Sequence, residues 1–168
     1  VGKKVSMRFL GVGFRDDNDL ACSAAVRFAG RLLLAASQDE KLVGILVQEL
    51  LELSATTAME AVKLLALTQV RMFAEKDPSV AEDFNVAIVP GCIRARNGAS
   101  KAIRKEADTI LYYSLGFKDG AKQGMANAEA FSSKFSTGDA AEFLALCRRS
   151  VLKAGAKEEE EKTDAQDE

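Results

Sequence analysis

The chain has 168 residues, of which 48% are apolar and 29% are charged, a length and composition typical of one globular domain. It contains no histidine, so it lacks the side chain that most often transfers protons near neutral pH and most often binds zinc or copper. The formal net charge is −2, but residues 157–168 hold seven acids and two lysines, which leaves 18 acids and 21 bases in residues 1–156. These features predict one helical domain over residues 1–156, followed by a disordered acidic tail at 157–168.

The three cysteines, Cys22, Cys92 and Cys147, are widely separated and odd in number. They form no CxxC pair, so neither a disulfide framework nor a zinc site is predicted. Three reduced thiols indicate an intracellular, reducing compartment. No apolar run approaches the ~18 residues that a membrane-spanning helix needs. Because the first residue is Val1 and not methionine, the earlier removal of a targeting peptide stays open.

Residues 1–15 alternate in part between apolar and polar side chains, which predicts a short extended arm. Gly11-Val12-Gly13 has the first two glycines of a dinucleotide-binding motif, but Asp16 stands where the third belongs, so we expect no nucleotide site there. Asp16, Asp17 and Asn18 are instead expected to cap the first helix. Counted from Asp17, the sequence also lacks the glycine and the final glutamate of a calcium-binding loop.

Two helices are predicted over residues 38–53 and 57–76, each begun by a capping-box sequence. Their apolar residues cover more of the helix surface than the ~100° stripe that a surface helix buries. Each helix is therefore expected to bury more than one face, either at the centre of a bundle or at a subunit interface. The residues predicted to form that interface are Leu42, Leu46, Leu50, Leu64 and Met72.

The second half of the chain predicts a short helix after Asp77-Pro78, extended chain over residues 85–91 and a helix over about 99–115. Two more helices are expected over residues 119–135 and from Thr137 to Gly155, and the residue identities show no internal repeat. The predicted fold class is therefore all-α: a bundle of about six helices with a short extended N-terminal arm and the disordered C-terminal tail.

One segment concentrates positive charge and is the predicted nucleic-acid contact. Five cations fall within residues 94–105 with no acid among them, and Tyr112 and Tyr113 follow on the same predicted helix as the last three cations. Cations beside aromatic rings are typical of surfaces that bind a phosphate backbone and stack on bases. The surplus of only three positive charges over residues 1–156 is small for a dedicated nucleic-acid binder. The five cations are Arg94, Arg96, Lys101, Arg104 and Lys105.

No set of residues has the pattern of a catalytic or metal site. A serine or cysteine nucleophile would need a base other than histidine, and no motif links such a pair. Glu49 and Glu52 lie three apart on one predicted helix, but a di-iron bundle also needs Glu-x-x-His pairs, which this chain cannot supply. No catalytic residue, metal ligand or cofactor is therefore predicted, although an apolar ligand would leave no motif.

The sequence thus predicts a non-catalytic structural or assembly subunit that packs through apolar helix faces into a homo- or hetero-oligomeric complex. Protein partners or self-association are expected, with no membrane span. The alternative is a nucleic-acid-binding subunit, as in a coat or nucleoprotein, that uses segment 94–105. A second alternative is an enzyme of unknown type. Partner identity and oligomeric number are not contained in the pattern.

Overall fold

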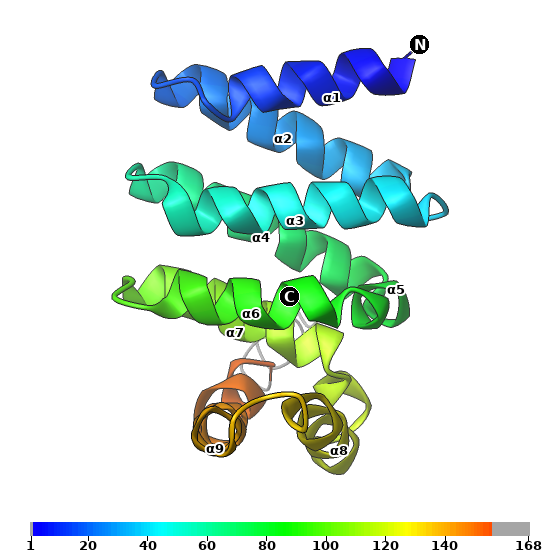
Figure 1. The fold of residues 1–168 in the computed structure, drawn as a ribbon, viewed down its shortest axis with the longest axis vertical. Helices are drawn as coiled ribbons and strands as arrows, with labels where there is room; N and C mark the ends of the chain where they lie inside the picture. Colours follow the sequence, from blue (N-terminus) through cyan, green and yellow to red (C-terminus); the bar gives the residue numbers. More distant parts are fainter. Residues whose placement is uncertain (1, 156–168) are drawn as a thin grey trace, which may run out of the picture.

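The structure is a computed structural model that describes residues 2–155, and within this range every regular element is helical (Figure 1). The predicted all-α class is therefore confirmed, but residues 2–155 hold nine α-helices and not about six. The predicted acidic tail lies outside the described residues. None of the described helices is both long enough and apolar enough to cross a membrane. The nine are α1 (Gly2–Gly13), α2 (Asp19–Ala35), α3 (Glu40–Thr56), α4 (Glu60–Lys76), α5 (Pro78–Asp83), α6 (Asn85–Arg96), α7 (Lys101–Ser114), α8 (Ala121–Ser132) and α9 (Thr137–Leu146).

Three helical hairpins are stacked on one another along the long axis of the molecule (Figure 1). Each hairpin pairs an outer helix with an inner helix: α1 with α2, α3 with α4, and α6 with α7. The outer helix α3 packs on α6, and the inner helix α4 packs on both α2 and α7. The molecule is thus a two-layered stack, the arrangement of an α-solenoid, in which each unit packs mainly on its neighbours.

The stack has a repeat of 41 residues. The inner helices α2, α4 and α7 begin at Asp19, Glu60 and Lys101, two equal steps along the chain. No repeat was predicted because residue identities vary, yet residues at equivalent positions are buried in every hairpin. Two such sets are Ala25, Ala66 and Ala107 on the inner helices and Leu10, Leu51 and Cys92 on the outer helices, none of them more than 2% exposed.

The predicted extended arm at residues 1–15 is wrong, because Gly2–Gly13 form helix α1. Met7 and Leu10 face the core at helical spacing, and Phe14 packs against it just after the helix ends. Gly13 belongs to this contact, since a Cβ atom there would lie 2.5 Å from the Cβ atom of Ala25. The glycines that resemble part of a nucleotide motif therefore end α1 and let the chain approach α2 closely.

Side-chain caps explain where several helices begin. Asn18 caps α2 as predicted, since its Oδ1 atom accepts hydrogen bonds from the backbone N–H groups of Leu20 and Ala21. Asp39 and Ser100 cap α3 and α7 in the same way. The last helix, predicted to begin at Thr137, begins there and is capped by Ser136. These caps position the loops between successive helices.

The predicted extended segment at 85–91 is also wrong, because these residues lie in helix α6, which contains Pro90. Proline lacks an N–H group, so the carbonyl of Val86 receives no helical hydrogen bond at this point. Val86 is 72% exposed, and water can therefore bond that carbonyl. Ile88, Val89 and Cys92 are buried, so packing holds the helix together around the proline.

The C-terminal end of the stack is covered by α8 and α9, which lie below α6 and α7 in Figure 1. Gly116 and Gly120 have φ angles of +77° and +134° and allow the tight connection from α7 to α8. The rings of Phe131, Phe135 and Phe143 meet edge to face or tilted at this end. A π-helical turn, Cys147–Val151, then continues α9.

A pair of glycine substitutions tests the stacking of α3 on α6. A Cβ atom at Gly91 would lie 2.9 Å from the Cβ atom of the buried Leu51, which cannot move without its backbone. We expect Gly91→Ala to lower the free energy of unfolding by about 1 kcal/mol despite the helix propensity of alanine. Gly11 lies in α1 with no atom within 4 Å of its Cβ position. Gly11→Ala should therefore raise stability by about 0.5–1 kcal/mol in the same urea titration, and equal shifts would contradict the packing described.

Candidate protein-interaction surface

The third hairpin is fastened by an ion pair between Arg96, the last residue of α6, and Asp108 of α7. Nε of Arg96 donates to Oδ1 of Asp108 at 2.6 Å, and Nη2 donates to Oδ2 at 3.3 Å. The two side chains are only 20% and 9% exposed. This two-pronged geometry gives guanidinium–carboxylate pairs their strength, because both partners are held in one orientation. Arg96 therefore has a structural partner, contrary to its expected place in an open cationic surface.

Burial raises the pKa values of three groups at or near this ion pair. Burial raises the pKa of Asp108, and the hydrogen bond and charge of Arg96 and the charge of Arg104 oppose that rise. Burial and the nearby Asp108 also raise the pKa of Cys92, and they raise the pKa of Cys147 to about 12. Both cysteines are fully buried. Neither is a thiolate near neutral pH, so these thiols act as apolar packing groups.

The five predicted cations divide into three groups. Arg96 is held by Asp108, and Arg94 reaches Glu52 on α3 at 3.6 Å, with both side chains more than half exposed. Lys101, Arg104 and Lys105 lie exposed in the first two turns of α7. The structure therefore does not bring the five together as one cationic surface, although the last three share the start of one helix.

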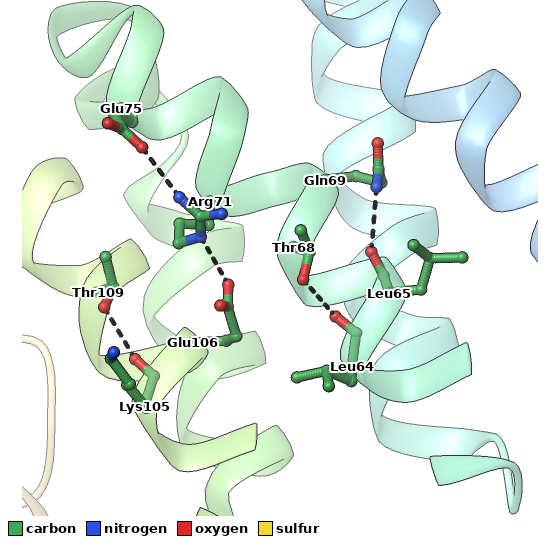
Figure 2. A network of polar contacts seen from close by, with 9 residues as sticks. All are labelled: Leu64, Leu65, Thr68, Gln69, Arg71, Glu75, Lys105, Glu106 and Thr109. Atoms are coloured by element: carbon green, nitrogen blue, oxygen red, sulfur yellow. Dashed lines mark hydrogen bonds and ion pairs between the residues drawn. The ribbon is translucent and has the colours of Figure 1, made fainter. Parts of the chain in front are cut away.

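A second polar contact crosses the inner layer between α4 and α7 (Figure 2). Nη1 of Arg71 lies 2.9 Å from Oε2 of Glu75, and its Nε lies 2.8 Å from Oε2 of Glu106 on the next hairpin. All three side chains are between 20% and 29% exposed. Glu106, the first acid after the cationic segment, is therefore turned toward α4 and away from Lys101 and Arg104.

The residues predicted to form a subunit interface lie mostly inside this chain. Leu46 and Leu50 are fully buried between hairpins, so their assignment to an interface is wrong. Leu42 and Leu64 are half-buried and pack against the core. Met72 is 40% exposed and keeps an accessible side chain. The wide apolar surface of α3 and α4 reflects their central place in the stack, one of the two explanations that the sequence left open.

Three exposed apolar residues of the outer layer, Ile45, Val86 and Ile93, lie near two grooves. A groove of about 570 Å³ runs between α3 and α6, with Ile45 on one side and Val86 and Pro90 on the other. Ile45 is 38% exposed and Val86 is 72% exposed. These two residues stand at equivalent positions of consecutive repeats, 41 residues apart. Charged residues of both signs, Glu40, Lys41, Asp83 and Arg94, border this groove.

A second groove, of about 640 Å³, runs along the other side of α6 and is closed by α9. Ile93, 37% exposed, lines it together with Phe135 and Leu146. Its charged border contains Arg96, Arg149, Asp139 and Glu142. Pro90 and Arg94 line both grooves, so the two form one surface centred on α6. We call this surface, which spans α3, α6 and α9, the outer face.

The outer face combines an apolar centre with a border of mixed charge, the composition of a protein–protein interface. Val86, Pro90 and Ile93 stand at steps of four and three residues along α6, so they form one ridge between the grooves. The sequence analysis missed this ridge because residues 85–91 were predicted to be extended. Within residues 2–155, no group of three or more cysteine, aspartate or glutamate side chains is placed to hold a metal ion.

Comparisons of this chain with protein-family models, with curated proteins and with solved structures gave no match.

Replacing Arg96 tests the fastening of α6 to α7. In Arg96→Met the carboxylate of Asp108 loses its partner, and we expect the free energy of unfolding to fall by about 3 kcal/mol near neutral pH. The pKa of Asp108 is already raised by burial and rises further without Arg96, so the folded state then favours the protonated acid. Stability of the variant should therefore fall as the pH rises through that pKa, and its deficit should be larger at about pH 8 than at about pH 5.

The matched control is Arg94→Met in the same helix. Arg94 and Glu52 are 58% and 55% exposed, and the loss of this pair should change stability by less than about 1 kcal/mol at either pH. Urea unfolding followed by circular dichroism measures both variants. Equal losses for the two arginines, or a deficit in Arg96→Met that does not change with pH, would contradict the role assigned to the buried pair.

Proposed function

We propose that this chain is a non-catalytic assembly subunit that holds a partner protein along its outer face. The observation that carries the proposal is the exposed apolar ridge Val86–Pro90–Ile93, flanked by two grooves whose borders carry both signs of charge. A nucleic-acid surface would carry positive charge in excess, and an enzyme pocket would gather ionisable groups in a deep cavity. An amphipathic helix of a partner, with apolar residues on one side and mixed charges beside them, matches this shape.

The stacked architecture supports the same proposal. A stack of helical hairpins exposes long outer and inner layers, and proteins built in this way use such extended surfaces for binding. Here the middle hairpin packs on the first and on the third hairpin, which holds α3 and α6 in place. The outer face therefore keeps its shape without a partner. A preformed surface loses little conformational freedom on association, which favours binding.

Site-specific photo-cross-linking tests the proposal in cells that make this chain naturally. A benzophenone side chain at Val86 or Ile93 should give the same discrete protein adduct, because Val86 lines one groove and Ile93 the other along the same ridge. Ala102, exposed on the inner layer, is the control position and should give no such adduct. Val86→Asp combined with Ile93→Asp should abolish association with that same protein. No adduct from the ridge, or an equal adduct from Ala102, would contradict the proposal.

A second candidate function is nucleic-acid contact through the start of α7. The first turn of this helix holds Lys101 and no acid, and Arg104 and Lys105 follow in the second turn. Cations are unfavourable near a helix N-terminus, because the helix dipole is positive there. The cations and the positive end of the helix dipole both attract negative charge, so this surface is suited to an anionic partner. Three phosphate contacts are nevertheless few, so we expect any binding to be weak and sensitive to salt.

A salt titration with a single-stranded oligonucleotide measures this contact. Three contacts predict that the logarithm of the binding constant falls against the logarithm of salt concentration with a slope of about −2. Replacing Lys101, Arg104 and Lys105 together by glutamine should abolish binding and leave the chain folded, because all three side chains are exposed. A small loss of stability is expected, since the charge of Arg104 favours the ionised form of Asp108. Binding at low salt that has no slope, or that survives this triple change, would exclude the candidate.

A further inference from the structure

One side of α4 packs on α2, and the equivalent side of α7 packs on α4. The equivalent side of α2, in the first hairpin, carries exposed residues. In α4 this face packs on α2: Gln69 occupies the space beside Gly30, and Nζ of Lys76 donates to the carbonyl of Leu34 at 3.0 Å. In α7 it packs on α4, where Glu106 meets Arg71 and Ile110 is fully buried. The face is thus an established stacking surface in two of the three repeats.

The 41-residue repeat identifies the corresponding residues of α2. Ala24 corresponds to Leu65 and Glu106, and Phe28 corresponds to Gln69 and Ile110. Ala24 is exposed, Phe28 is 37% exposed, and Leu20, one turn earlier on the same face, is 76% exposed. Arg27 and Arg31 border this stripe and are exposed as well. We call the stripe formed by Leu20, Ala24, Phe28 and Arg31 the end face.

We propose that the end face is the contact between two copies of this chain, which pair by a twofold axis through Ala24 with their α2 helices antiparallel. In this arrangement Leu20 of one copy lies opposite Phe28 of its partner, and the two Ala24 residues meet at the axis. A small residue at the crossing point lets two helices approach closely, as Ala25 does where α2 meets Gly13 at the end of α1. A contact of this kind is isologous, since each surface binds its own copy.

The charges of α2 select this antiparallel arrangement. Asp19 is its first residue and Asp17 lies in the bend just before it, whereas its C-terminal half carries Arg27 and Arg31 with no acid up to Ala35. Antiparallel pairing about Ala24 brings Arg31 of each copy toward the acidic segment before α2 of the other, which contains Asp17, so both ends of the contact are complementary in charge. Parallel pairing would place like charges together, and like charges across an interface are unfavourable.

The contact is separate from the outer face, so this inference goes beyond the proposed function and either can fail alone. The mass of the full chain in solution, measured by analytical ultracentrifugation over a wide concentration range, is the first test. We expect the mass to rise from 18.1 kDa toward twice that value as concentration increases. Leu20→Asp should keep the chain monomeric at every concentration, with an unchanged melting temperature because Leu20 is exposed.

Val86→Asp is the matched control, since it replaces a similarly exposed apolar residue on α6, and it should leave the monomer–dimer equilibrium unchanged. Arg31→Asp should weaken the dimer at least tenfold, and the added change Asp17→Arg should restore it. The axis itself is tested by Ala24→Cys, which should form a disulfide between two copies under mild oxidation. Ala102→Cys should not, and the natural cysteines are buried.

Three outcomes would overturn the inference. A chain that stays monomeric at every concentration removes the contact. A dimer that survives Leu20→Asp but is lost in Val86→Asp forms through the outer face instead. If Ala24→Cys forms a disulfide with another protein and not with its own copy, the end face has a different occupant.

Discussion

The packing of the inner helices on one another is the constraint on which the structure depends. A helical hairpin has two apolar faces and can cover only part of this surface by itself, so each hairpin needs a neighbour on the stack. Ala25, Ala66 and Ala107 recur at one position of α2, α4 and α7 and are fully buried in all three, and Ala25 lies directly against Gly13 at the end of α1. Gln69 and the ion pair between Arg71 and Glu106 fix which helices meet (Figure 2).

This constraint also shapes the surface that is left. Helix α6 packs on α7, where Arg96 binds Asp108, and on α3. Its remaining side therefore lies at the surface and forms the ridge. Pro90 lies in that ridge, where a missing backbone hydrogen bond costs least because water can reach the carbonyl of Val86. The outer face is therefore a consequence of stacking.

Much of the fold could be predicted because apolar spacing and capping residues act locally. Asn18 and the proline after Asp77 mark helix starts that the structure confirms. The stack could not be predicted, because the 41-residue repeat preserves burial and not identity. Leu10, Leu51 and Cys92 share one position with two different side chains. Helix α6 was missed because proline and glycine weaken the helical pattern, while tertiary packing overrides that local preference.

The candidate sites show the same division between local and long-range information. The spacing of Lys101, Arg104 and Lys105 on one helix follows from the sequence. The pairing of Arg96 with Asp108 does not follow from the sequence, because Asp108 lies on another helix. The pair forms only when α6 and α7 fold back on each other. Charge counted along a chain therefore overstates the charge that a surface presents.

The two ends of the stack differ, and this difference bears on the assemblies that the chain can form. At one end the turn Phe117–Asp119 and the π-helical turn Cys147–Val151 pack on α7, with α8 and α9 beyond them, so this end of the stack is covered. At the other end Leu20 and Ala24 on the corresponding surface of α2 are exposed. If copies stacked head to tail they would build a filament, since such contacts do not close. With one end covered, head-to-tail stacking has no receiving surface, and a pair joined through α2 closes on itself.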